Sequence, residues 1–483
     1  MADEAPEVPR NSPTFGSLPA EIRLNIIATA SEDPPRDYLA LVCKEWQHEV
    51  EKKTFESLVI GRRQLLPFLD YIKLPEYGCR FCPGPQGYHS NSSAEFRQCL
   101  KNLLRILSRW TRGNLTLEID AYSPSDSEHF FKGYYVGDPD EDEAFGDPRT
   151  FNDGKHEFSH NGRSRPQDRD AREVYHMFGG FFLPVFNRAT VVKRLIIRRQ
   201  CRRQYHPRFL SHLLPALPAL EHIHYEPWRM HDEVYQDREW YPGKTARSYF
   251  IASPGADLHA TDVSEIISRH LPRNLKTLTL FEDFNEDFWP RSDAPERIPN
   301  AQTAEALLDA SLELKRVSAS FMVDAQDFFS AYERCYSEHK WEKLEFLALT
   351  SRFVSPGNDT RLTELLEAAG TFALGAPRLR TMILWYGRRN RACAFLYNRD
   401  DTSITWQGIW PFDLNQQFIT RIWERVADSH NARVPLSVRT RLVTDEIKSH
   451  GDAIHYLGLP AGSVVDALSL RQIRVEGRIV YTD

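Results

Sequence analysis

The chain has 483 residues, and 61 lysines and arginines against 67 aspartates and glutamates give it a formal net charge of −6. This small negative charge argues against a general nucleic-acid-binding protein, which carries a strong positive excess. The composition is 41% hydrophobic and 27% charged, as in an ordinary soluble globular protein. The length predicts two or three structural units, unless the chain is built from repeats.

Residues 1–14 are acidic and proline-rich, which predicts a disordered N-terminus without the apolar core of a signal peptide. No apolar run approaches the roughly 18 residues that a membrane-spanning helix needs, so we expect no membrane partner. The seven cysteines are odd in number and mostly isolated. This cysteine usage predicts a reducing compartment, either the cytosol or the nucleus.

Residues 15–60 contain the most regular apolar spacing in the chain. Pro19 suits the first turn of a helix, and Ile22 and Ile26 fall on one face of that helix. Pro34 and Pro35 end it, because a residue before proline is pushed out of the α region. A second helix is expected over 37–50, with one apolar stripe: Leu39, Val42, Cys43 and Trp46. On spacing alone, this hairpin could equally serve only the core of its own chain.

The order and spacing of Leu18-Pro19-x-Glu21-Ile22 and Leu39-x-x-Val42-Cys43-Lys44-x-Trp46 resemble the F-box family. The resemblance implies a small helical domain that binds a Skp-type linker protein and, through it, a cullin ubiquitin ligase. The join between the helices departs from many family members, because it carries two prolines. The implied linker-binding face is Leu18, Pro19, Ile22, Ile26, Leu39, Val42, Cys43 and Trp46.

Residues 61–119 are predicted to be mainly helical, with a leucine stripe over 96–110, before a strand over 114–119 that alternates apolar and polar residues. Residues 120–170 are rich in Asp, Gly, Ser and Pro and show little periodicity. They are expected to form a loop insertion within the second unit, which spans 61–390.

An apolar-x-x-apolar-x-apolar pattern recurs along the second unit, and a helix candidate separates most copies. The helix candidates are 207–214, 263–270, 304–310, 325–339 and 362–372. The strand copies are Val192/Leu195/Ile197, Leu220/Ile223/Tyr225, Leu275/Leu278/Leu280, Leu314/Val317/Ala319, Leu344/Leu347/Leu349 and Leu379/Met382/Leu384.

This alternation resembles a leucine-rich-repeat protein, in which each strand and helix form one repeat. The copies are irregularly spaced and lack the Asn or Cys that normally follows the strand. The alternative is an ordinary α/β domain with several parallel strands. We expect an α/β fold: an N-terminal helical F-box, then an irregular leucine-rich-repeat-like solenoid and a helical C-terminal cap.

If the solenoid forms, alternate strand residues point outward and could contact a partner. Large aromatic residues among them could instead be packed beneath a loop. These positions are Arg198, His224, Glu226, Thr279, Phe281, Ser318, Ser320, Thr350, Ile383 and Trp385.

The C-terminal segment, 391–483, is predicted to open with a hairpin whose turn is at 398–401. Helices near 438–449 and 464–473 are expected to cover the last repeat, which otherwise leaves an apolar edge open. The helix containing Ile419-Thr-Arg-Ile-Trp423 and the closing Ser469-Leu-Arg-Gln-Ile473 resemble those of uncharacterised fungal F-box proteins.

Three patterns suggest further chemistry. His156-Glu157-Phe-Ser-His160 matches the zinc-peptidase signature, but turn-forming residues flank it where the chemistry needs a helix. Cys79 and Cys82, with His89 and Cys99, could bind zinc, but a single C-x-x-C with Gly- and Pro-rich neighbours favours a plain loop. A basic cluster follows the first strand copy and is either a solvated strand end or a site for an acidic or phosphorylated partner: Arg194, Arg198, Arg199, Arg202 and Arg203.

The preferred function is therefore a substrate-recruiting adaptor of a ubiquitin ligase, which needs no cofactor and performs no bond chemistry itself. Its partners would be the linker, the cullin and an unknown protein substrate. A binding scaffold that assembles no ligase is the alternative. A zinc-dependent hydrolase that uses His156, Glu157 and His160 is a more distant alternative.

Overall fold

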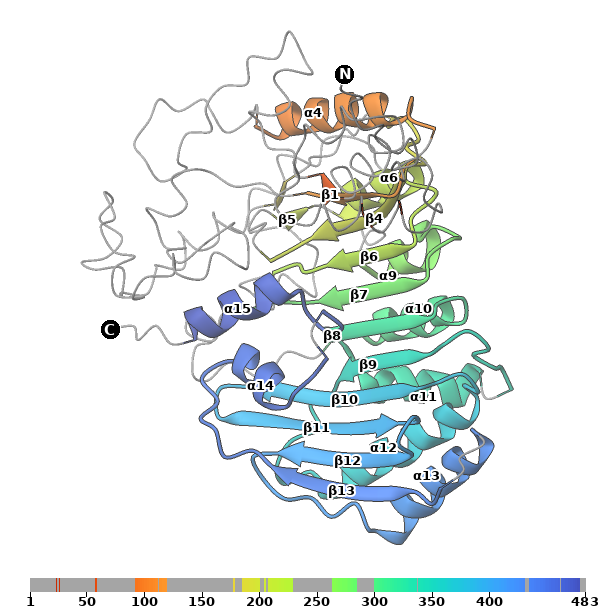
Figure 1. The fold of residues 1–483 in the computed structure, drawn as a ribbon, viewed down its shortest axis with the longest axis vertical. Helices are drawn as coiled ribbons and strands as arrows, with labels where there is room; N and C mark the ends of the chain where they lie inside the picture. Colours follow the sequence, from red (N-terminus) through yellow and green to blue (C-terminus); the bar gives the residue numbers. More distant parts are fainter. Residues whose placement is uncertain are drawn as a thin grey trace, which may run out of the picture.

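A computed structural model describes residues 23, 26, 57–58, 92–111, 113–119, 177–178, 185–199, 204–205, 207–228, 263–284, 299–336, 338–430, 434–460 and 462–477. These residues form an α/β fold around an 11-stranded, mostly parallel sheet (Figure 1). The order of strands across the sheet follows the order in the chain, β1-β2-β4-β6-β7-β8-β9-β10-β11-β12-β13. Two further strands, β3 (Met177–Phe178) and β5 (Gln204–Tyr205), pair with each other.

Across the sheet from β1 to β10, each strand pairs in parallel with the next one in the order. Their bounds are β1 Ser57–Leu58, β2 Leu115–Glu118, β4 Val192–Ile197, β6 His222–Tyr225, β7 Thr277–Phe281, β8 Arg316–Asp324, β9 Phe346–Thr350 and β10 Thr381–Arg388. The expected strand copies at 192, 220, 275, 314, 344 and 379 all contribute to this series. The copies are irregularly spaced along the chain, but the strands that they form pair in register with their neighbours.

Helices connect most of these parallel strands and lie on one face of the sheet. They are α4 (Ser92–Leu107), α6 (Pro207–Ala216), α9 (Val263–Glu265) with the π-helix η8 (Ile266–His270), α10 (Ala301–Ser311), α11 (Ala325–Cys335) and α12 (Asp359–Leu374). Asn300 and Asp324 begin α10 and α11 by accepting bonds from backbone N–H groups two residues later. All five helix candidates of the second unit are confirmed.

The sheet continues through an antiparallel hairpin, β11 (Arg391–Asn398) and β12 (Ser403–Gly408), as the turn residues predict. Its strands pair on both sides, with β10 and with β13 (Ser437–Leu442). The prediction of a helix from residue 438 is wrong, since 437–442 pairs in parallel with β12. Helix α13 (Gln417–Ser429) packs on α12, where Gly370 leaves room for the side chain of Ile422.

Two hydrophobic cores lie on opposite faces of the sheet. In β9, Leu347 and Leu349 enter the core beneath the connecting helices, while Phe346 and Ala348 enter the other core. This division follows from the two-residue period of a strand. Both faces of the central strands are therefore buried, as their nearly continuous apolar sequences require.

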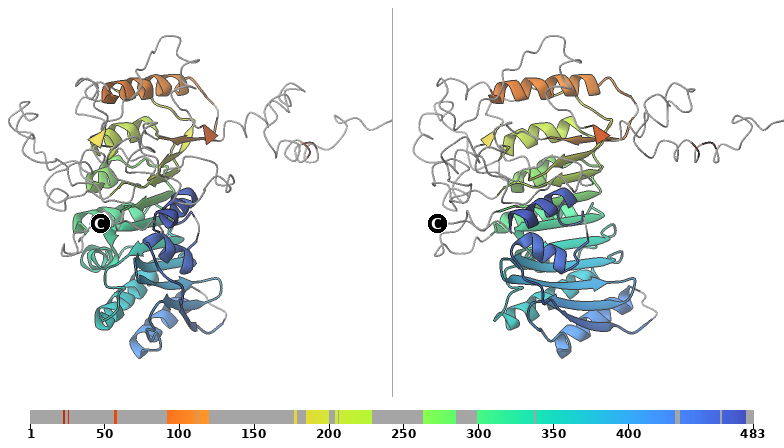
Figure 2. Two further views of the ribbon diagram at one scale, coloured as in Figure 1. Left: turned by 90° about the vertical axis from the view of Figure 1, so that its left-hand side faces the viewer. Right: turned by 60° about the vertical axis from the view of Figure 1, so that its left-hand side comes forward.

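The second core is covered by α14 (His450–Tyr456) and α15 (Ala467–Glu476), which lie on the face opposite α10–α13 (Figure 2). Part of the C-terminal end does cover the last repeat, as expected, because α13 packs on α12. Helices α14 and α15 instead fold back across the face of the sheet, where Ile454, Leu457 and Ile473 are buried against the strands. Gly387 permits the approach, since its missing Cβ would lie 2.5 Å from that of Ala453.

Candidate functional site

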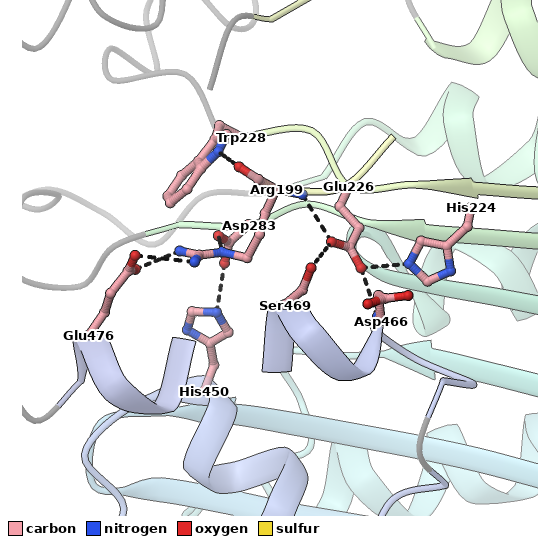
Figure 3. Close-up of polar contacts among 9 residues, drawn as sticks. All are labelled: Arg199, His224, Glu226, Trp228, Asp283, His450, Asp466, Ser469 and Glu476. Atoms are coloured by element: carbon pink, nitrogen blue, oxygen red, sulfur yellow. Dashed lines mark hydrogen bonds and ion pairs between the residues drawn. The ribbon is translucent and has the colours of Figure 1, made fainter. Parts of the chain in front are cut away.

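Charged residues gather just beyond the carboxyl ends of three neighbouring strands. Arg199 follows β4, Glu226 follows β6 and Asp283 follows β7. Parallel strands place their carboxyl ends at one edge, where open α/β sheets commonly bind ligands. His450 and Glu476, from α14 and α15, reach the same place (Figure 3). We refer to these five residues as the strand-end cluster.

Arg199 lies at the centre of the strand-end cluster and is only 1% exposed. Its Nη1 and Nη2 donate to the two carboxylate oxygens of Glu476 at 3.2 and 2.6 Å, and its Nε donates to Asp283. Its guanidinium lies 4.5 Å from the ring centre of Trp228, whose Nε1 donates to the Arg199 carbonyl. Burial alone would lower the pKa of Arg199, but Asp283 and Glu476 together raise it above its usual value.

Asp283 joins Arg199 to helix α14. Its Oδ1 lies 2.8 Å from Nε2 of His450, and both side chains are buried. The imidazole of His450 also stacks on Phe284, with 4.4 Å between ring centres. Burial would raise the pKa of Asp283, but Arg199 and His450 outweigh it and lower the pKa. Asp283 is therefore a buried carboxylate whose charge is compensated from two sides.

Glu226 joins the sheet to the start of α15. It accepts bonds from the backbone N–H of Arg199 at 3.0 Å and of Asp466 at 2.8 Å, and from the hydroxyl of Ser469. Nε2 of His224 lies 2.5 Å from its Oε1. Burial would raise the pKa of Glu226, but these contacts, with His224 foremost, lower it. A carboxylate is also favoured here by the positive end of the α15 dipole.

Arg198 provides a second connection to α15. It donates to Glu118 at 2.5 Å, and its Nε forms an ion pair with Asp466, the N-cap residue of α15, at 3.0 Å. Of the basic cluster found in the sequence, Arg198 and Arg199 thus pair with acidic groups of their own chain, whereas Arg194 is exposed. Arg202 and Arg203 lie outside the described residues.

The strand-end cluster is arranged to hold α14 and α15 in position and not as a serine–histidine–carboxylate relay that activates a nucleophile. Two histidines pair with carboxylates, His450 with Asp283 and His224 with Glu226, and the Ser469 hydroxyl donates to Glu226 itself and not to an imidazole. Ions this deeply buried are stable only when paired, so every contact constrains the two helices that supply the partners. The cluster fixes α14 and α15 on the strands.

A small pocket lies beside the cluster, at the carboxyl ends of β8, β9 and β10. Its volume is about 30 Å³, and its lining comprises Phe284, Pro299, Phe321, Val323, Asp324, Thr350, Ser351, Arg352, Tyr386 and Arg388. A second cavity of about 30 Å³ lies beneath α6 and η8 and is lined almost entirely by apolar side chains.

The structure corrects the expected partner-contact surface. The ten positions do lie on or next to neighbouring strands, but eight of them are covered by α14, α15 and the loops between strands. The buried eight are Glu226, Thr279, Phe281, Ser318, Ser320, Thr350, Ile383 and Trp385. Arg198 and His224 are half-buried and bonded to acidic residues. The alternative interpretation, packing of Phe281 and Trp385 beneath another segment, is the one that holds.

Most residues of the expected linker-binding face lie outside the described residues: Leu18, Pro19, Ile22, Leu39, Val42, Cys43 and Trp46. Ile26 is described, and it is helical and 39% exposed. The residues His156, Glu157 and His160, and the candidate zinc ligands Cys79, Cys82 and His89, also lie outside. Cys99 is described, and it lies half-buried in α4.

Within the described ranges, no group of three or more His, Cys, Asp or Glu residues could hold a metal ion. In the same part of the chain, no helix combines the length and apolarity that a bilayer crossing requires.

Sequence reasoning identified Arg199 and Glu226 but missed Asp283, His450, Ser469 and Glu476. Asp283 could have been found as an acidic residue that ends an apolar strand. His450 and Glu476 carry no local signal, because their partners are more than 160 residues away.

The fold and the strand-end cluster define an α/β protein whose C-terminal helices are attached to the sheet by buried ion pairs. Residues 270–466 match the model of a family of unknown function, DUF6546. The match is less than half of the chain and extends from the residues before β7 to the N-cap of α15. No curated protein matches the chain.

Proposed function

We propose that this protein is an F-box adaptor that recruits a protein substrate to a Skp–cullin ubiquitin ligase. Residues 15–60 bind the linker, and the remainder forms an irregular, leucine-rich-repeat-like solenoid that presents the substrate. The adaptor does no bond chemistry. It raises the effective concentration of a substrate lysine near the ubiquitin-charged enzyme, as a tether does for any linked pair. Such an adaptor works in the cytosol or the nucleus.

The observation that carries this proposal is the two-part apolar pattern from Leu18 to Trp46. Ile26, which belongs to the expected linker-binding face, is 39% exposed and is therefore accessible to a partner helix. An exposed apolar residue on the expected linker-binding face is what a partner helix needs.

The succession of parallel strands, each followed by a helix in most cases, supports the solenoid. Strands added in chain order produce a long sheet whose units contact mainly their neighbours. In this proposal the strand-end cluster has a structural role, because its charged side chains engage one another and hold the C-terminal helices on the sheet.

Co-purification with a Skp-type linker tests the proposal. Ile26→Asp, and Ile22→Asp combined with Trp46→Ala, should abolish linker binding by placing charge or empty space in an apolar contact. Asn25→Asp is the matched control, because it adds a negative charge without altering an apolar side chain of the expected linker-binding face, and it should retain binding. Equal linker binding by all variants would refute the F-box assignment.

The same purification separates the adaptor from a scaffold that assembles no ligase. An adaptor brings the cullin down with the linker and supports ubiquitin transfer to a bound partner. Linker without cullin, and no transfer to any bound protein, would establish the scaffold instead.

A further inference from the structure

Strand β13 forms one end of the 11-stranded sheet, and among the described residues no strand pairs with its outer edge (Figure 1). On the inner edge, the N–H groups of Ser437 and Val443 donate to carbonyls at the two ends of β12. The backbone groups of successive strand residues point to opposite edges, so the odd-numbered residues bond to β12. Val438, Thr440 and Leu442 therefore direct their N–H and C=O groups away from the sheet.

The outer edge of β13 is accessible over most of its length. Arg439, Thr440, Arg441 and Leu442 are all exposed, and Leu442 is 55% exposed. An unpaired strand edge is a template for a further strand, and proteins usually cover it, shorten it or place charges on it. Here the edge is left open and carries two arginines, so the arginines decide which strand can be added.

The two arginines disfavour a second copy of this chain as the added strand. Only one two-fold antiparallel register engages all three outward residues of both copies, and it is centred on Thr440. This register places Arg439 of each copy directly opposite Arg441 of the other. Like charges directly opposite each other destabilise a strand pair. The same positions favour a strand that carries carboxylates.

The positive charge at this edge is only partly compensated within the chain. Nη1 of Arg439 donates to Asp401 at 2.7 Å, in an ion pair whose side chains are both about half exposed. Nη2 of Arg441 donates to a neutral group, the Tyr456 carbonyl, at 2.5 Å, and no carboxylate of the described residues pairs with it. The acidic residues 445–446 follow the end of the strand. One positive charge therefore remains beside the outward backbone groups.

We propose that the outer edge of β13 binds an extended acidic segment of another protein, which is added to the sheet as a further strand. The outward backbone groups of Val438, Thr440 and Leu442 provide the hydrogen bonds, and alternate side chains provide the specificity. Two acidic residues of the partner, separated by one residue, lie opposite Arg439 and Arg441. The intervening and flanking positions are β-branched or apolar and cover the exposed leucine.

Fluorescence anisotropy of a labelled peptide, measured with the full chain, tests the proposal. The probe acetyl-Ser-Val-Glu-Thr-Glu-Val-Ser has the proposed alternation and should bind with a Kd of about 0.1 mM or lower. A peptide in which lysine replaces both glutamates should bind about tenfold more weakly or worse. Undetectable binding of the acidic probe at about 1 mM, or equal binding of the two peptides, would overturn the proposal.

N-methylated versions of the probe show whether backbone pairing carries the binding. In antiparallel addition, the N–H of the central threonine faces β13, and the glutamate N–H groups point away from it. Methylation of the threonine nitrogen should then weaken binding about tenfold, and methylation of a glutamate nitrogen is the matched control. The reverse pattern would establish parallel addition to the same edge. Equal effects of the two methyl groups would refute strand addition.

Substitutions in the protein locate the binding. Thr440→Pro removes an N–H that points away from β12, so it should leave the fold intact and abolish binding. Arg441→Glu should weaken binding of the acidic peptide about tenfold and strengthen binding of the lysine peptide. Arg378→Glu makes the same charge change at an exposed position before β10 and should alter neither. Unchanged binding in both β13 variants would overturn the site, and near-ultraviolet circular dichroism verifies that each variant is folded.

Analytical ultracentrifugation tests the competing occupant, a second copy of the chain. A dimer that Thr440→Pro dissociates would show that β13 pairs with itself and would overturn the proposal. The inference does not depend on the proposed ligase function, because linker binding concerns residues 15–60 and peptide binding concerns β13. Each can therefore fail without the other.

Discussion

Arg199 and Glu476 are 277 positions apart in the chain, and they form a buried bidentate ion pair with an Nη2–Oε2 distance of 2.6 Å. The pair joins the segment that follows β4 to α15, the last described helix. Together with the contact between Asp283 and His450, it attaches the C-terminal helices to the carboxyl edge of the sheet. The cluster thus sets the position of the second core.

The first prediction concerns the centre of this cluster. Arg199→Met should lower the free energy of unfolding by about 3–5 kcal/mol, because it leaves Asp283 and Glu476 buried with a cationic partner removed. Urea denaturation followed by tryptophan fluorescence measures the change.

The control for this measurement is Arg380→Met, which removes an exposed ion pair with Asp400. Solvent screens that pair, so the urea midpoint should stay the same. If Arg199→Met shifts the midpoint no more than Arg380→Met does, the cluster does not hold the C-terminal helices.

The second prediction concerns pH. Burial tends to lower the pKa of His224, but Glu226 outweighs burial and raises the pKa above the ordinary 6.5. The contact of protonated His224 with Glu226 therefore stabilises the fold fully below pH 6.5, and this stabilisation is lost as the pH rises through the raised pKa of His224. The pKa of Glu226 is lowered, so its contribution is present above pH 4.5 and is lost on acidification through the lowered value.

Urea midpoints measured from about pH 6 to about pH 9, on both sides of the ordinary histidine pKa, test this account. The midpoint of the natural chain should fall across this range, and His224→Gln should make the fall smaller. An unchanged slope in His224→Gln would show that His224 is not the titrating group.

The third prediction contrasts two hydroxyls beneath the C-terminal helices. Ser320 is fully buried, and its Oγ has no hydrogen-bond partner among the described residues. Thr350 is also buried, but its Oγ1 accepts a bond from Phe321 N–H and donates to the Val323 carbonyl. Ser320→Ala should therefore be neutral or stabilising by up to about 1 kcal/mol, whereas Thr350→Val should destabilise by about 1–3 kcal/mol.

Thermal unfolding of the two variants side by side checks the contrast. Each substitution removes one hydroxyl at a similar depth, so the pair controls for burial. A loss in Ser320→Ala as large as that in Thr350→Val would mean that the Ser320 hydroxyl has a partner, such as an ordered water.

The alternating strand and helix segments of the second unit could be predicted from the sequence because their signals are local. Leu347 and Leu349 recur at the two-residue period of a strand, and α10 and α11 begin at Asn300 and Asp324, which are typical N-cap residues. The strand β13 was missed because Ser437–Leu442 is short and carries two arginines, so only its pairing with β12 defines it.

The sequence alone determined the class of fold, since apolar spacing at two and 3.6 residues acts within a few turns of the chain. It also supplied the residues of the F-box-like pattern and the basic cluster after β4. Only the tertiary structure decided which face of the sheet α14 and α15 cover. That choice depends on buried ion pairs and apolar contacts between residues more than 160 positions apart, and such contacts leave no periodic mark in the sequence. For the same reason, strand positions that looked outward-facing, such as Phe281 and Trp385, became core.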